Sequence, residues 1–117
     1  MDNTSRTTNN ATEIDAVLAA VSQVYNGGFG QFFFNRPASY QSALTGFRLI
    51  GLPVLANLLI EAYAQIMPFD EYLDTTDMSR LQLRRIRRLE ADWSKHCGDD
   101  GDIVDAYIEQ YLSRNVV

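Results

Sequence analysis

The chain has 117 residues and a net charge of −5, with 46% hydrophobic and 21% charged residues. These values are typical of one globular domain, and they argue against a general nucleic-acid binder, which needs positive charge against the phosphate backbone. A single histidine and a single cysteine exclude a structural zinc site and an internal disulfide framework. We therefore expect one domain with no metal and no cofactor.

The N-terminal segment is polar and contains no core-forming side chain before Ala11. We expect a disordered arm over residues 1–11 and a folded domain over residues 12–117. The segment lacks the apolar core of a secretory signal, and no apolar stretch reaches the ~20 residues that a bilayer span requires. Together with the free cysteine, these features predict a cytoplasmic protein that does not bind membranes.

Helical spacing of apolar residues begins behind Thr12 and Asp15, which have the form of a capping box. The Asn26-Gly27-Gly28 sequence ends this first helix, because glycine accepts a positive φ. Its residues at helical spacing, which we expect to face the core, are Ile14, Val17, Leu18, Val21, Val24 and Tyr25.

Glycine and proline divide the middle of the chain into further helices. Residues 29–35 predict one or two helical turns, and Pro37 starts a helix that ends before Gly51. Pro53 starts an apolar helix that runs to about Met67. Its polar stripe is Asn57, Glu61 and Gln65.

Aspartates mark the starts of the last two predicted helices. Asp77 is expected to cap a helix that runs to about Lys95, and Asp102 with Asp105 to cap the C-terminal helix. The residues of this last helix that we expect to face inward are Val104, Tyr107, Ile108, Tyr111 and Leu112. No strand pattern competes, so we predict an all-α, single-domain compact bundle of about five to six helices.

Catalytic and metal-binding patterns are weak. His96 and Cys97 are adjacent, so on a helix they point about 100° apart and form no catalytic pair. The aspartates from Asp99 onward fail the calcium-loop register, because the fifth ligand place is Val104. We expect no enzyme and no catalytic residue. The alternative is an apolar pocket with a buried general acid or base, built from Gln31, Asn35, Glu61 and tyrosines.

Residues 26–35 read Asn-Gly-Gly-Phe-Gly-Gln-Phe-Phe-Phe-Asn, a helix stop followed by aromatic residues. This segment resembles the Asn-Gly-Gly-Phe-x-Gln-Phe-Phe-x-Asn signature of a bacterial domain family of unknown function, whose best-known members are acidic DNA-mimic proteins. We interpret the matching residues as structural, with the rings in the core and the amides satisfying backbone groups at a tight turn. They are Asn26, Gly27, Gly28, Phe29, Gln31, Phe32, Phe33 and Asn35.

The resemblance extends over about residues 14–112. Further matches are Ile50-Gly51, Glu61-Ala62, Met67-Pro68, Arg80, Leu89 with Asp92, and Tyr107-Ile108. The resemblance implies an all-helical domain and, for the mimic class, binding to a DNA-binding protein. The net negative charge argues against direct binding to nucleic acid.

Negative charge is concentrated in the second half of the chain. Residues 1–58 sum to zero, and residues 59–117 carry the whole excess of −5. Asp102, Asp105 and Glu109 recur on one helix face, about 4.5 and 6 Å apart along the axis. Duplex DNA presents a phosphate every ~3.4 Å per strand. We predict an acidic ridge that imitates phosphates, made of Asp99, Asp100, Asp102, Asp105 and Glu109, and extended by Asp70, Glu71 and Asp74.

A cluster of arginines argues against a DNA mimic whose whole surface is acidic. Its members are Arg80, Arg84, Arg85, Arg87 and Arg88. Three interpretations stay open: internal pairing with residues 70–77 or 99–105, a solvated surface, or a second face that grips an acidic partner or phosphate. Separate acidic and basic faces also leave open a head-to-tail association of copies or a homodimer.

The leading hypothesis is a non-enzymatic interaction protein that occupies the cationic surface of a DNA-binding protein. The alternative is an immunity or antitoxin-like inhibitor of a basic toxin or nuclease, because the same electrostatics serve both functions.

Overall fold

Helices make up the part of the chain that the structure describes. The computed structural model describes residues 4–67 and 79–114, and these ranges contain no strand. The predicted all-α, single-domain bundle is confirmed. In chain order the elements are α1 (Thr4–Gly27), α2 (Phe29–Asn35), η1 (Pro37–Ser39), α3 (Tyr40–Leu49), α4 (Pro53–Ile66), α5 (Arg80–Cys97), η3 (Asp99–Gly101) and α6 (Asp102–Arg114).

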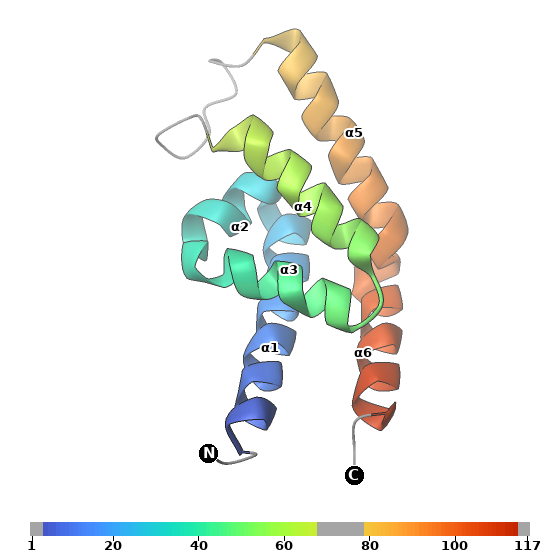
Figure 1. The fold of residues 1–117 in the computed structure, drawn as a ribbon. Coiled ribbons are helices and arrows are strands. Elements are labelled where there is room, and N and C mark those ends of the chain that lie inside the picture. The colour runs from blue at the N-terminus through green and yellow to red at the C-terminus, as the bar shows by residue number, and fades with distance from the viewer. Residues whose placement is uncertain (1–3, 68–78, 115–117) are drawn as a thin grey trace.

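The helices form an elongated arrangement in which α3 and α4 lie in front of α1 (Figure 1). Helix α1 packs mainly against α2 and α3, and α4 packs against α3 and α5. Helix α5 begins at the upper end of the view and leads down into α6, which extends beside the first half of α1 at the lower end. The start of α5 and the whole of α6 therefore lie toward opposite ends of the molecule.

The short helix α2 places aromatic rings in the centre of the bundle. Phe29, Phe32 and Phe33 are each at most 1% exposed, as the signature predicts. The Phe29 and Trp93 rings form a T-shaped pair with centroids 5.4 Å apart, and the Phe33 and Tyr63 rings form another at 5.2 Å. These contacts connect α2 to α5 and to α4, so one short helix holds the two longer ones in place.

Close contact between α1 and α3 depends on Gly46. A Cβ atom built at this position would lie 2.6 Å from the backbone carbonyl oxygen of Glu13. Because a backbone atom cannot swing away, only glycine lets the two helices approach this closely. Sequence patterning does not reveal this requirement, since Gly46 lies inside a helix.

Helix α1 begins before the predicted capping box. The helix begins at Thr4, so Thr12 and Asp15 lie inside it rather than at its N-terminus, and residues 4–11 continue the helix. The segment contains neither glycine nor proline. Adding turns to a helix that already packs on a core avoids the cost of nucleation, and Thr and Asn each cost less than about 1 kcal/mol relative to Ala.

The caps of the last two helices also differ from the prediction. Ser79 caps α5: its hydroxyl accepts a hydrogen bond from the Gln82 amide, and the Gln82 side chain accepts one from the Ser79 amide. This reciprocal capping box starts the helix at Arg80, whereas Asp77 lies outside the described residues. Asp102 and Asp105 lie within the first turn of α6, where negative side chains interact favourably with the positive end of the helix dipole.

Gly28 joins α1 to α2 in a backbone conformation that is essentially restricted to glycine, with φ 84° and ψ 177°. A Cβ atom there would also lie 2.8 Å from Oε2 of Glu90. We expect Gly28→Ala to lower the free energy of unfolding by about 1–3 kcal/mol, measured by urea denaturation.

Gly30→Ala is the matched control for Gly28→Ala. Gly30 lies inside α2 and is not among the positive-φ glycines of the described residues. Alanine there should leave stability unchanged or raise it by about 0.5–1 kcal/mol. Equal stability of the Gly28→Ala protein and the wild type would show that the turn does not depend on glycine.

Candidate protein-interaction face

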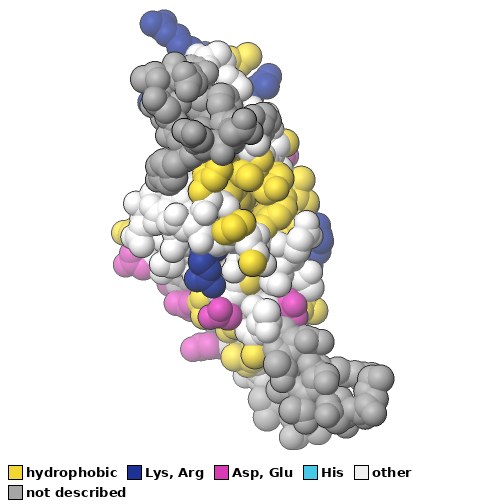
Figure 2. Space-filling model, turned by 90° about the vertical axis from the view of Figure 1, so that its left-hand side faces the viewer, with side chains coloured by type: hydrophobic (Ala, Val, Ile, Leu, Met, Phe, Trp, Pro, Cys, Tyr) yellow, Lys and Arg dark blue, Asp and Glu magenta, His cyan; other side chains and the backbone are white. Residues whose placement is uncertain are grey.

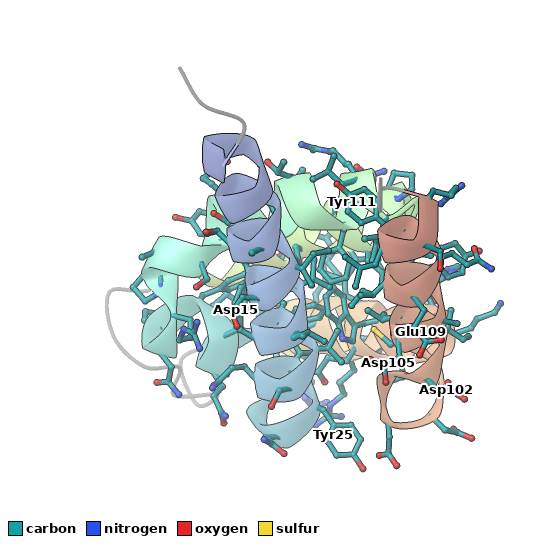
Figure 3. All side chains as sticks on the ribbon, turned by 90° about the horizontal axis from the view of Figure 1, so that it is seen from below. Asp15, Tyr25, Asp102, Asp105, Glu109 and Tyr111 are labelled. Carbon is teal, nitrogen blue, oxygen red and sulfur yellow. The ribbon has the colours of Figure 1, made fainter. Side chains whose placement is uncertain are left out.

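Five carboxylates of the predicted ridge are exposed, and we call them the acidic face: Asp99, Asp100, Asp102, Asp105 and Glu109. Asp99 and Asp100 belong to η3, and the other three project from α6. Figure 3 shows Asp102, Asp105 and Glu109 along α6, with Asp15 on the far side of α1. The remaining members of the predicted ridge, Asp70, Glu71 and Asp74, lie outside the described residues.

A groove of about 280 Å³ runs between α1 and the acidic face. Two of its lining residues, Leu18 and Tyr25, were expected in the core but are 44% and 72% exposed. They remain exposed because α1 packs mainly against α2 and α3, which cover its other sides. The full lining is Leu18, Val21, Ser22, Tyr25, Asn26, Asp100 and Asp105.

This groove combines apolar surface with negative charge, which neither helix pattern predicted. Tyr25 is a large, amphipathic ring beside carboxylates, and tyrosine is enriched among the residues that contribute most to protein–protein affinity. Leu112 was likewise expected inside and is 48% exposed on α6.

The arginine cluster does not neutralise the acidic face. Its members are exposed, and none of them forms an ion pair with the carboxylates of η3 or α6 among the described residues. On the face that Figure 2 shows, basic side chains lie both at the end where α5 begins and near mid-height, and most of the visible carboxylates lie in the lower half. Pairing of the cluster with residues 99–105, one of the three open interpretations, is absent among the described residues, and pairing with residues 70–77 falls outside them.

Two amides of the signature bind a side chain rather than the backbone of a turn. Nε2 of Gln31 and Nδ2 of Asn35 both donate to Oε1 of Gln23, at 3.0 and 3.2 Å. Their common acceptor lies on α1, so the two amides fix α2 against α1. A Cβ atom at Gly27 would collide with the end of the Gln31 side chain, so a larger residue there would require this side chain to move.

The candidate catalytic groups are not arranged for catalysis. Glu61 is exposed on α4, so it lacks the burial that the alternative of a buried general acid or base requires. Cys97 is buried at the end of α5, and burial raises the pKa of its thiol to about 12, so the nucleophilic thiolate does not form near neutral pH. Within the described residues, no group of three His, Cys, Asp or Glu side chains is placed to hold a metal ion.

None of the helices in the described residues combines the length and the apolar character that crossing a membrane would require.

The fold and this face define a small all-helical protein whose exposed chemistry is a row of carboxylates beside an apolar groove. The chain belongs to the DMP19-like protein family, whose sequence model matches residues 6–115. This is a DNA-mimic-like family, and it is not a known enzyme family. No curated protein and no solved structure gave a match.

Proposed function

We propose that this chain is a non-enzymatic, cytoplasmic interaction protein that occupies the cationic surface of a DNA-binding protein. The observation that carries the proposal is the acidic face, whose carboxylates are exposed, project from consecutive elements, and have no arginine paired to them among the described residues. Membership of a DNA-mimic-like family supports it. One chain presents the whole face, so the proposal requires no dimer.

Physical chemistry supports such a role through steering. A row of negative charge raises the rate at which a cationic surface arrives, and salt screens this attraction beyond about 8–10 Å. The apolar groove beside the row then supplies contact area that DNA itself does not offer. The electrostatic attraction favours any DNA-binding surface, whereas contact with the apolar groove allows the chain to select one partner.

The test is competition with DNA. The immobilised chain should capture its partner from an extract of its own cells in low-salt buffer and release it in high-salt buffer. The purified partner is then bound to its fluorescently labelled DNA and titrated with the chain. We expect the fluorescence anisotropy to fall to that of free DNA, and the association rate of chain and partner to drop about tenfold or more at high salt.

The chain alone is the control, and it should leave the anisotropy of the labelled DNA unchanged. A partner that keeps its DNA at saturating chain would contradict the proposal. A captured nuclease or toxin whose activity the chain blocks would favour an immunity protein instead.

A further inference from the structure

A second hollow adjoins the groove of the acidic face. This cleft, of about 460 Å³, lies between the end of α1 and the second half of α5. It shares Val21, Tyr25 and Asn26 with the groove that leads to Asp100 and Asp105. A partner seated on the acidic face therefore has the cleft directly beside it.

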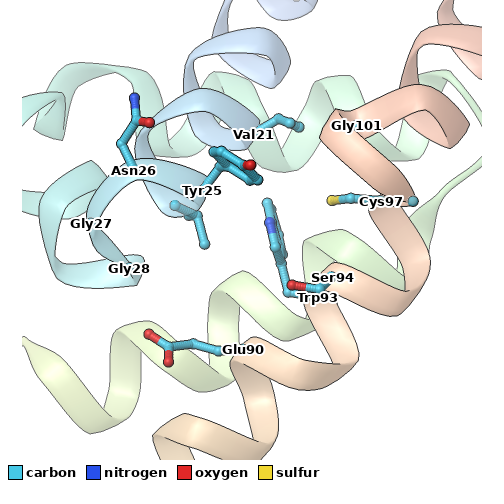
Figure 4. A pocket seen from close by; sticks show the side chains of 12 residues that line it. Val21, Tyr25, Asn26, Gly27, Gly28, Glu90, Trp93, Ser94, Cys97 and Gly101 are labelled. Atoms are coloured by element: carbon cyan, nitrogen blue, oxygen red, sulfur yellow. The ribbon is translucent and has the colours of Figure 1, made fainter.

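Glu90 supplies the charge of this cleft. Among the described lining residues there is no lysine or arginine, and Glu90 is the one ionisable carboxylate. Its side chain is half-buried and points toward Gly28 (Figure 4). It forms no hydrogen bond or ion pair with another described residue, and burial raises the pKa of this carboxyl although the nearby Arg87 acts to lower it.

The end of α1 adds partial negative charge to the cleft, whereas the short helix α2 begins beside it at Gly28 with its positive end. Helix α1 ends here, and the last carbonyl groups of a helix lack intrahelical donors and carry the negative end of its dipole. The Gly28 amide satisfies the Val24 carbonyl, which leaves the later carbonyls of α1 without a backbone donor among the described residues. A half-buried carboxylate beside such a helix end is a place where a cation is favoured.

Two aromatic side chains complete the cleft. Tyr25 is 72% exposed, whereas Trp93 is 3% exposed and is held by edge contacts with Phe29 and Phe47. Figure 4 shows both rings around the same space as Glu90. A planar guanidinium group can pair with a carboxylate through two hydrogen bonds while it stacks on an aromatic ring, and a lysine ammonium cannot do both.

We propose that this cleft receives an arginine side chain of the DNA-binding partner, with Glu90 pairing the guanidinium group and Tyr25 covering it. The proposal rests on the proposed function for the identity of the partner. The acidic face then sets the rate of encounter, and the cleft sets how long the complex lasts.

The first experiment uses no partner. The probe is Nα-acetyl-arginine amide, and Nα-acetyl-citrulline amide is its uncharged counterpart. Because Trp93 is the one tryptophan of the chain, its fluorescence and its indole N–H resonance report on the cleft directly. We expect the arginine probe to shift both signals with a Kd on the order of millimolar, and the citrulline probe to shift neither.

Three variants assign the binding. Glu90→Gln should raise the probe Kd about tenfold or more, and it should fold normally because burial already disfavours the charge that it removes. Tyr25→Ala should also weaken binding, without loss of stability, since the ring is mostly exposed. Glu61→Gln removes an exposed carboxylate outside the cleft and should bind like the wild type.

The second experiment uses the purified partner. Glu90→Gln should raise its dissociation rate about tenfold or more and leave the association rate and its salt dependence unchanged. No shift of the Trp93 signals by the arginine probe, or an unchanged dissociation rate in Glu90→Gln, would overturn the cleft proposal. Failure of the proposed function can be distinguished from failure of the cleft proposal. In that case the partner keeps its DNA in the competition experiment, while the arginine probe still binds to the cleft.

Discussion

Reversing Asp105 and Glu109 to lysine should reduce the association rate with the partner by at least about tenfold and remove most of its salt dependence. Both carboxylates are exposed on α6, about 6 Å apart along the helix axis. Their reversal replaces attraction by repulsion on the α6 part of the acidic face, where a cationic surface would approach. Surface plasmon resonance at several salt concentrations measures the rate, and circular dichroism verifies that the helices remain.

The matched control is the double variant Glu61→Lys with Asp92→Lys. It changes the net charge by the same amount, but both residues are exposed on other helices, α4 and α5. A local acidic face predicts a large effect for the α6 variant and a small one for the control. Equal effects of the two variants would mean that overall charge, and not the face, attracts the partner.

Replacing Phe33 by alanine should lower the free energy of unfolding by about 3–5 kcal/mol. The Phe33 side chain is 1% exposed. Its ring contacts Phe29 and Phe32 within α2, and Tyr40 and Tyr63 on the neighbouring helices. Removal leaves a cavity that rings held on several helices cannot easily close. Chemical denaturation monitored by circular dichroism gives the loss.

Phe34→Ala is the internal comparison, because the same residue type occupies the next position of α2 but is only half-buried. We expect less than half of the loss at Phe33. If both variants unfold at the same denaturant concentration, the aromatic centre around Phe33 does not dominate the stability of the fold.

The sequence was sufficient for the helical architecture. Gly28, Gly51 and Pro53 separate helices in the structure as their residue types predict, with φ of 84° and 93° at the two glycines. Pro37 likewise opens the turn that precedes α3. These residues act through local backbone sterics, which do not depend on distant parts of the chain, so their effect can be predicted from residue order alone.

Helix starts were predicted less well than helix ends. Thr12 with Asp15 and Ser79 with Gln82 both have the form of a capping box, yet only the second is used. A capping pair stabilises a helix start by about 1 kcal/mol, which continued helix can outweigh when no glycine or proline interrupts it. Whether a capping pair marks the actual helix start therefore depends on the packing of the whole helix.

Only part of the candidate site could be predicted from the sequence. The row of carboxylates on α6 follows from helical periodicity, so the sequence by itself determined it. Only the tertiary structure decided three other features. They are the exposure of Leu18 and Tyr25, the cleft beside Glu90, and the separation of the arginine cluster from the acidic face. The physical reason is that periodicity states which residues share a helix face, whereas the packing of other helices determines whether that face is covered and which charges lie near it.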